Sequence, residues 1–255
     1  MKSQIIEKLK KIESQNNVTI LYACESGSRA WGFDNAESDY DVRFIYKSNN
    51  LKDYVSLSSK KDVIEVMEGD LDIVGWDLKK ALLLHYRGNP NLREWIISPI
   101  KYIDWKIDIF KSLPDFDDAI LKYHYTSIAS NNWKLLSLND LEITKKVIKM
   151  YLYNCRCILA WLLLDMGINP PINIFEMLKH VDDDIKNDIC YLIKYYKNCC
   201  IENLNLEVIS RINKWMGENL EIMRKDFPKT NKNHDFEAYD EKFFEILSED
   251  FENYI

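Results

Sequence analysis

The chain contains few of the residues that form linkers, and it lacks a long apolar run. Its 255 residues include only seven glycines and six prolines, which leaves little room for flexible linkers or low-complexity segments. The longest uninterrupted apolar stretch, 157–164, covers eight residues and is too short to span a bilayer. The N-terminal pattern predicts a charged amphipathic helix and not a signal peptide. We therefore expect a cytoplasmic protein that makes no contact with a membrane.

An excess of basic charge is also missing. Lysine and arginine number 34 against 41 aspartates and glutamates, which gives a formal net charge of −7. A broad basic surface of the kind that drives salt-dependent nucleic-acid binding is therefore not expected, and RNA would need a local patch of lysines. The six cysteines lack the spacing of zinc ligands, so we interpret them as reduced and mostly buried. With 47% apolar residues, the chain can bury a sizeable core in two modest domains.

The most informative segment is an expected strand with acidic residues on one face. In an extended segment alternate side chains point the same way, so Asp39, Asp41 and Arg43 share a face. Val42 and Phe44 point to the opposite, apolar face. Two carboxylates at this separation repel each other unless a cation lies between them. Mg²⁺ prefers carboxylate oxygens, water and substrate phosphates, so the pattern predicts a divalent metal site.

A possible phosphate-binding turn precedes this strand. The β-branched and apolar run 18–24 predicts a buried strand, and it leads directly into Gly27 and Ser28. A strand followed by a Gly-Ser turn and a helix start places backbone N–H groups and a hydroxyl where phosphate oxygens can bind. Gly27 and Ser28 are therefore our candidates for the β- and γ-phosphates of a nucleotide.

The same residues carry a resemblance to a known superfamily. Gly27-Ser28, then ten residues, then Asp39-x-Asp41 on a strand resembles the DNA polymerase beta-like nucleotidyltransferases. The segments SGSRAWGF, SDYDVRFIY, GDLDIVGWDLKKAL, NPNLREW and SPIKY resemble the predicted nucleotidyltransferases associated with RNA ligases in RNA repair. The similarity covers residues 24–102 and, more faintly, 145–178. It implies transfer of an NMP from an NTP to an acceptor hydroxyl, with release of pyrophosphate and with Mg²⁺ or Mn²⁺ as cofactor.

The superfamily also implies a third carboxylate on a neighbouring strand. The candidates are Asp70, Asp72 and Asp77. We choose Asp72, because a short strand-like run follows it and because it is the Asp of the family's Asp-Leu-Asp-Ile segment. Asp77 precedes a helical pattern and is better interpreted as its N-cap, and Asp70 follows a glycine as turn residues do. The resemblance thus implies that Asp39, Asp41 and Asp72 are catalytic and hold the metal.

Other candidate binding residues allow two interpretations each. Arg43 lies on the metal face, where it could contact a phosphate or the acceptor, or form a buried ion pair with one of the aspartates. Lys149, Tyr153 and Arg156 are spaced i, i+4 and i+7, so they fall on one stripe of a helix. The resemblance includes the Tyr-x-x-Arg of this stripe, which could bind the triphosphate; the alternative is a solvated face. Trp31 is more easily explained as a core residue than as a base-stacking one.

The expected fold class is α+β. A small mixed β-sheet with flanking helices, residues 1–113, would form the polymerase beta-like nucleotidyltransferase domain, and residues 114–255 an α-helical domain, with a nucleotide between them. In the first domain we expect helices at 78–86 and 92–97 and a short strand at 100–103. In the second, amphipathic periodicity predicts helices at 115–136, 140–166, 173–180, 184–199, 205–224 and 236–252.

Three functions remain open at this stage. The first is nucleotidyl transfer from an NTP to an RNA end, as the resemblance suggests. The second is the same chemistry on a protein or small-molecule hydroxyl, which the acidic composition favours. The third is a non-catalytic nucleotide-binding module, against which the intact aspartate triad argues. The preferred base and the oligomeric state do not follow from the sequence.

Overall fold

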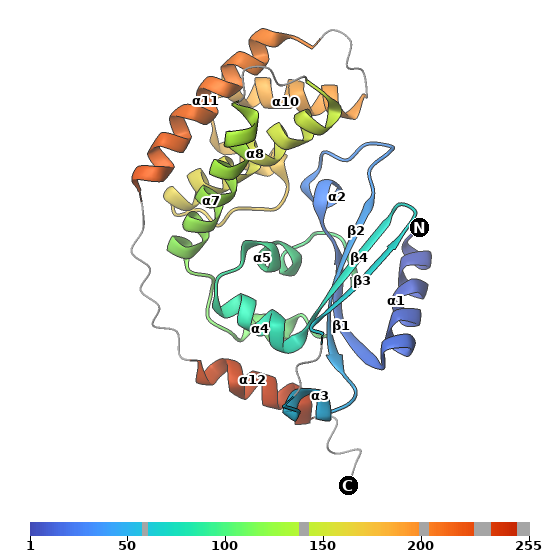
Figure 1. Ribbon diagram of the computed structural model, residues 1–255. Helices are drawn as coiled ribbons and strands as arrows, with labels where there is room; N and C mark the ends of the chain where they lie inside the picture. Colours follow the sequence, from blue (N-terminus) through green and yellow to red (C-terminus); the bar gives the residue numbers. More distant parts are fainter. Residues whose placement is uncertain (58–60, 138–142, 199–203, 227–235, 249–255) are drawn as a thin grey trace. The chain divides into compact units, whose positions relative to one another are not determined.

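The N-terminal half of the chain contains a five-stranded mixed sheet (Figure 1). The computed structural model describes residues 1–57, 61–137, 143–198, 204–226 and 236–248. The strands are β1 (Val18–Glu25), β2 (Tyr40–Ser48), β3 (Val63–Glu68), β4 (Leu71–Asp77) and β5 (Lys101–Ile103), in the order β3-β4-β2-β1-β5. β2 and β4 run parallel, and the other neighbouring pairs run antiparallel. With the helices that follow, this sheet confirms the expected α+β class.

One face of the sheet packs on the first helix. Helix α1 (Lys2–Asn16) buries Ile5, Leu9 and Ile12 almost completely. They share a cluster with every second residue of β2, Val42 and Phe44 among them. The apolar face predicted for β2 is thus the face that α1 covers.

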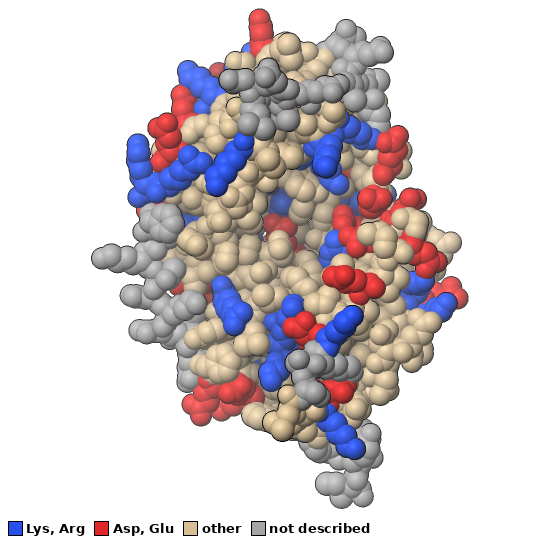
Figure 2. All heavy atoms as spheres, viewed as in Figure 1, with Lys and Arg blue, Asp and Glu red and all other residues tan. Residues whose placement is uncertain are grey.

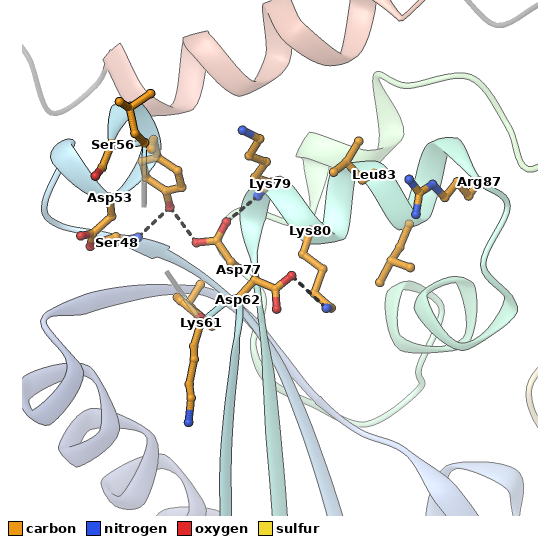
Figure 3. A pocket seen from close by; sticks show the side chains of 14 residues that line it. Ser48, Asp53, Ser56, Lys61, Asp62, Asp77, Lys79, Lys80, Leu83 and Arg87 are labelled. Carbon is orange, nitrogen blue, oxygen red and sulfur yellow. Dashed lines mark hydrogen bonds and ion pairs between the residues drawn. The ribbon is translucent and has the colours of Figure 1, made fainter. Parts of the chain in front are cut away.

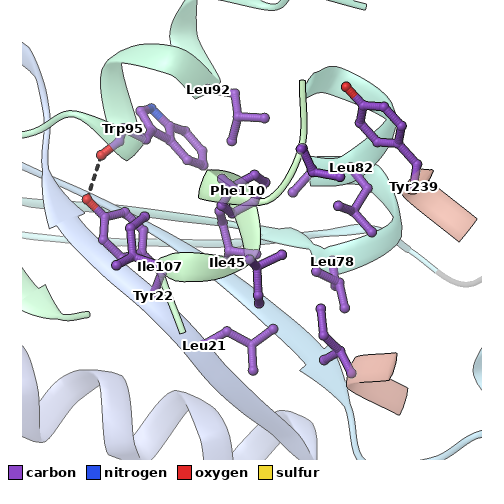
Figure 4. Close-up of a cluster of buried hydrophobic side chains, with 14 of the residues drawn as sticks. Leu21, Tyr22, Ile45, Leu78, Leu82, Leu92, Trp95, Ile107, Phe110 and Tyr239 are labelled. Atoms are coloured by element: carbon purple, nitrogen blue, oxygen red, sulfur yellow. Dashed lines mark hydrogen bonds between the residues drawn. The ribbon is translucent and has the colours of Figure 1, made fainter. Parts of the chain in front are cut away.

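The opposite face is covered by helices that come from distant parts of the sequence. They are α4 (Leu78–Tyr86), α5 (Pro90–Ile96), α6 (Asp108–Lys111) and α12 (Glu237–Ser248). Figure 4 shows Ile45 of β2 among Leu78, Leu82 and Phe110. Ile45 lies on the same face as Asp41 and Arg43, and so does Lys47, whose Nζ donates to the Ile246 carbonyl oxygen of α12 at 3.4 Å. The apolar packing around Ile45 thus separates Asp41 and Arg43, at the N-terminal end of the strand, from Lys47 at its other end.

Two capping motifs explain where α4 ends and where α5 begins. Gly88 has a φ of 65°, in the left-handed region that favours glycine, so the chain leaves α4 there as the sequence predicts. The expected second helix, 92–97, begins earlier than predicted. Asn89 accepts a hydrogen bond from the Leu92 amide at 3.0 Å, and Pro90 occupies the first helical position. The Asn-Pro pair thus marks the start of α5.

The C-terminal half is helical, as predicted. Its elements are α7 (Asp118–Leu136), α8 (Lys145–Asp165), α9 (Ile174–Met177), the 3₁₀ helix η1 (Leu178–His180), α10 (Asp183–Lys197) and α11 (Leu206–Lys225). α7, α10 and α11 all pack against α8. α8 begins at Lys145 because the Thr144 hydroxyl caps the Val147 amide, at 3.3 Å. Of the predicted helical residues, 140–142, 199 and 249–252 lie outside the described residues.

Among the described residues, one helix, α8, is long and apolar enough to span a membrane by length and composition. Its most apolar window is, however, 78% buried inside the protein. Burial of this kind is what the central helix of a helical core shows.

By their contacts, the described residues form two compact units. The first contains 1–30, 39–116 and the residues from 236 onwards, and the second contains 31–38 and 117–226. Helix α12 therefore belongs with the sheet, and the segment 31–38 belongs with the helices α7 to α11. The domain limits expected from the sequence, 1–113 and 114–255, divide the chain differently and stay a prediction. The two further short helices, α2 (Gly27–Trp31) and α3 (Lys52–Val55), follow β1 and β2.

Gly75→Ala should destabilise the sheet. Gly75 pairs with Phe44, and a Cβ on Gly75 would lie 2.1 Å from Phe44 Cζ. Overpacking of this kind costs about 1 to 3 kcal/mol, which urea unfolding would measure. In Gly217→Ala the new Cβ would lie 3.6 Å from Trp133, an ordinary contact, so this helical control should be neutral or stabilised by up to about 1 kcal/mol. Equal effects of the two substitutions would contradict the packing of Phe44 over Gly75.

Candidate active site

The parallel pairing of β2 and β4 brings two of the predicted catalytic aspartates together. Asp41 and Asp72 are register partners near the N-terminal ends of the two strands. Their side chains are 22% and 28% exposed. The other candidates for the third carboxylate lie where predicted: Asp77 caps α4 by accepting from the Lys79 amide at 2.8 Å, and Asp70 lies in the turn between β3 and β4. Asp72 is thus the candidate that lies beside Asp41.

Arg43 connects these two carboxylates. Its Nη2 donates to Asp41 Oδ1 at 2.9 Å and to Asp72 Oδ2 at 2.8 Å, while Nη1 donates to the Asp72 carbonyl oxygen at 2.8 Å. The Arg43 side chain is 16% exposed. Of the two interpretations of Arg43, the structure contains the ion pair, and it involves both aspartates. The cation that two neighbouring carboxylates require is supplied by the chain itself.

Asp39 lies just outside the strand. It is exposed and immediately precedes β2. Arg29 Nε donates to the Asp39 carbonyl oxygen at 3.1 Å, and the guanidinium carbon of Arg29 lies 3.8 Å from the centroid of the Tyr40 ring. These contacts fix the backbone at the entry to β2. Within the described ranges, no group of three His, Cys, Asp or Glu side chains is placed to hold a metal ion together. Asp39, Asp41 and Asp72 therefore do not form a three-carboxylate centre in this arrangement.

The Gly27 turn packs directly on the Asp41 carboxylate. Gly27 has a φ of 60°, and a Cβ at this position would lie 1.9 Å from Asp41 Oδ2. The Ser26 amide donates to the Asp41 carbonyl oxygen at 2.8 Å, which ties the turn to the start of β2. Glycine is therefore required here both for its backbone conformation and for space. Ser28 is only 2% exposed, and its predicted role with phosphates stays a prediction.

A fourth carboxylate, Glu25, was missed by the sequence reasoning. Glu25 ends β1 and is completely buried. Its Oε1 accepts from the Asp41 amide at 2.8 Å, and its Oε2 accepts from the Tyr102 hydroxyl. The pKa of Glu25 is raised, mainly because the carboxylate is buried; the hydrogen bonds from Tyr102 and from the Asp41 amide oppose this effect and lower the pKa. The available signal was an acidic residue that directly continues an apolar strand into the glycine turn.

The stripe on α8 packs on Trp31. The guanidinium carbon of Arg156 lies 4.2 Å from the centroid of the Trp31 ring, and Tyr153 meets that ring edge-on at 4.7 Å. Lys149 Nζ lies 5.6 Å from the centroid of the Tyr153 ring. Arg156 is 6% exposed, so its part of the stripe is not a solvated face. Lys149, Tyr153 and Arg156 do share one stripe, but they belong to the second unit and the three aspartates to the first.

Arg43→Gln should destabilise the first unit, because it leaves Asp41 and Asp72 facing each other without a cation. Hydrogen bonds to charged groups suggest a loss of about 1 to 3 kcal/mol. Mg²⁺ should then raise the melting temperature of this variant more than that of the unmodified protein. The control is Arg211→Gln, which removes an ion pair with Asp188 on the helical unit. An equal response of all three proteins to Mg²⁺ would contradict the bridging role of Arg43.

The chain matches a family model and is similar to two known proteins. A family model described as "RNA repair pathway DNA polymerase beta family" matches residues 1–245. The protein YcgL of Bacillus subtilis (strain 168), whose name describes it as uncharacterized, is 40% identical over 187 residues, which cover 71% of this chain and 70% of YcgL. A solved nucleotidyltransferase-like protein from Exiguobacterium sibiricum is 14% identical, with a TM-score of 0.32, over 96% of this chain and 80% of that one. The resemblance that the sequence segments carry is thus confirmed, and the chain belongs to the RNA repair pathway DNA polymerase beta family of nucleotidyltransferases.

Proposed function

We propose that this nucleotidyltransferase moves an NMP from an NTP to the hydroxyl of an RNA end, with release of pyrophosphate. The observation that supports this most directly is the register of β2 and β4, which holds Asp41 beside Asp72 and against the Gly27 turn. The proposal of an RNA acceptor rests on the description of the family.

The donor set suits a magnesium ion that is completed by substrate. Mg²⁺ is usually bound by one or two carboxylates together with substrate phosphates, and it needs no dedicated cage of protein ligands. Asp39 and Asp41 offer two carboxylates at the entry to β2, so we propose that they hold Mg²⁺, or Mn²⁺, together with the triphosphate. When bound, such an ion offsets the negative charge of the phosphates. Asp72 as a further ligand would require the Arg43 guanidinium to move away.

The remaining chemistry is proposed for the residues of the chain. The acceptor oxygen bonds to the α-phosphorus, the bond from that phosphorus to the bridging oxygen breaks, and pyrophosphate leaves with the electron pair. Arg43 binds Oδ2 of Asp72, which leaves Oδ1 to accept the proton of the hydroxyl. Gly27 and Ser28 would contribute backbone N–H groups to the triphosphate. Catalysis of this type depends mainly on positioning and on charge stabilisation.

A protein or a small molecule is the alternative acceptor. The net charge of −7 favours it, because a phosphate backbone is repelled by acidic surfaces. Basic and acidic side chains are interspersed on the face that Figure 2 shows. Incubation with α-labelled NTPs, Mg²⁺ and either total RNA or cell lysate would distinguish the acceptors, because the label would move to RNA or to protein. Label transferred to neither would favour a non-catalytic nucleotide-binding module.

An Asp39→Asn/Asp41→Asn double variant should lose metal-dependent NTP binding, because both proposed metal ligands become neutral. Calorimetry should show no gain in ATP affinity when Mg²⁺ is added, while circular dichroism should show an intact fold. Asp72→Asn is the contrast: it should bind MgATP nearly normally and transfer the nucleotide poorly. Unchanged MgATP affinity in the double variant would mean that the metal is held elsewhere.

Arg156→Lys tests whether the α8 stripe also binds the triphosphate. The substitution keeps a positive charge but loses the planar group that stacks on Trp31. If Arg156 contacts the β- and γ-phosphates, ATP binding should weaken by about tenfold while AMP binding stays unchanged. Equal loss for ATP and AMP, or a lower melting temperature without a change in affinity, would assign Arg156 to packing alone.

A further inference from the structure

A pocket of about 480 Å³ opens at the end of the sheet that lies away from Asp41 and Asp72 (Figure 3). Asp41 and Asp72 lie near the N-terminal ends of β2 and β4, whereas Tyr46 and Asp77 are register partners at the carboxyl ends of these strands. The pocket is lined by residues of β2, α3, β4 and α4 and of the segments next to them, Tyr54, Asp77 and Lys79 among them. At about 3.3 Å per residue, Ser48 is roughly 20 Å from Asp41 along β2, so this pocket is separate from the candidate active site.

The acidic side chains of the pocket are held by groups of the protein. The Tyr54 hydroxyl donates to Asp77 Oδ2 at 2.9 Å and accepts from the Ser48 amide at 2.8 Å. Asp62 pairs with Lys80 at 2.9 Å, and Asp53 accepts from the Ser48 hydroxyl. Asp62 is thus paired with a cation. The hydroxyl groups that bind Asp53 and Asp77 are neutral, so these hydrogen bonds hold the two carboxylates without cancelling their charge.

Three basic side chains of the pocket make no such pair. Lys79 and Arg87 come from the two ends of α4, and Lys61 from the segment before β3 (Figure 3). Among the residues that the structure describes, none of the three forms an ion pair. The lining has four basic and three acidic side chains, and the cations at the two ends of α4 favour an anionic ligand on that side of the pocket.

An apolar hollow of about 520 Å³ adjoins this pocket. The two hollows share Tyr54, Lys79 and Leu83. The second lies between α3, α4 and α12 and is lined mainly by aliphatic and aromatic side chains, Phe243 and Phe244 among them. An aromatic surface of this kind accepts the flat face of a base. Together the hollows offer an apolar compartment for a base and a cationic compartment for phosphates.

We propose that these joined hollows are a second nucleotide site, which binds a nucleoside polyphosphate through Lys79 and Arg87. The base lies against Phe244, which is 63% exposed and lines the apolar hollow, and the phosphates lie over α4. Because the protein supplies the positive charges, binding at this site needs no divalent ion. The proposal does not depend on the proposed function, since it uses none of the residues assigned to nucleotidyl transfer.

The test measures ATP, tripolyphosphate and AMP binding by calorimetry in EDTA, with the full-length chain. Lys79→Gln/Arg87→Gln should weaken ATP and tripolyphosphate binding at least tenfold. Phe244→Ala should weaken ATP but not tripolyphosphate, which has no base. Lys2→Gln/Lys10→Gln removes the same charge from α1, outside both hollows, and should bind ATP like the unmodified protein.

Several outcomes would overturn this second site. They are the absence of ATP binding in EDTA, unchanged affinity in Lys79→Gln/Arg87→Gln, and loss of EDTA-resistant binding in Asp39→Asn/Asp41→Asn. The last would assign the bound nucleotide to the aspartate site. If Lys79→Gln/Arg87→Gln instead lost binding of a short RNA oligonucleotide and kept that of ATP, the pocket would be an RNA-backbone site. MgATP binding and transfer are measured separately, so failure of either proposal leaves the other intact.

Discussion

The candidate active site depends on one electrostatic constraint, the contact of a single guanidinium with two carboxylates on neighbouring parallel strands. Parallel pairing places Asp41 beside Asp72, and like charges at this distance destabilise the sheet unless a cation separates them. Arg43, two residues after Asp41 on the same face, is within reach of both. The Gly27 turn and the buried Glu25 then fix Asp41 from the other side. A group that bound the same carboxylate oxygens would have to displace Arg43.

The sequence predicts much of this arrangement because its strongest patterns are local. Alternation along β2 correctly separates the face of Val42 and Phe44 from the face of Asp41 and Arg43, and amphipathic periodicity predicts the helices from α7 to α11. Asp72 was chosen from the family segment, and its pairing with Asp41 is what the parallel register produces. The alternation and the helical periodicity are set by residues close together in the chain, where side-chain period and capping act directly.

What the sequence does not predict depends on contacts between distant residues. Glu25 was missed because its role comes from the Asp41 amide and the Tyr102 hydroxyl, 16 and 77 residues further along the chain. Trp31 packs against Arg156 and Tyr153, which are more than 100 residues away in the sequence. These contacts explain why the segment 31–38 belongs with the helices, although the residues on both sides of it belong with the sheet. The pocket above α4 combines residues of β2, α3, β4 and α4, and no single segment indicates it.

The placement of α12 has a consequence for how the chain folds during synthesis. Tyr239 and Ile246 of α12 are buried in the same core as Leu78, Leu82 and Ile45, yet they follow the whole helical unit in the sequence. During translation, the second face of the sheet therefore stays incomplete until the ribosome has made the helices α7 to α11. Residues 117 to 226 of the helical unit are nearly continuous in the sequence. This unit can therefore assemble while the core of the sheet unit still lacks α12. The apolar surface that α12 covers, on α4 and around Ile45, is thus closed only after the helices α7 to α11 have been made.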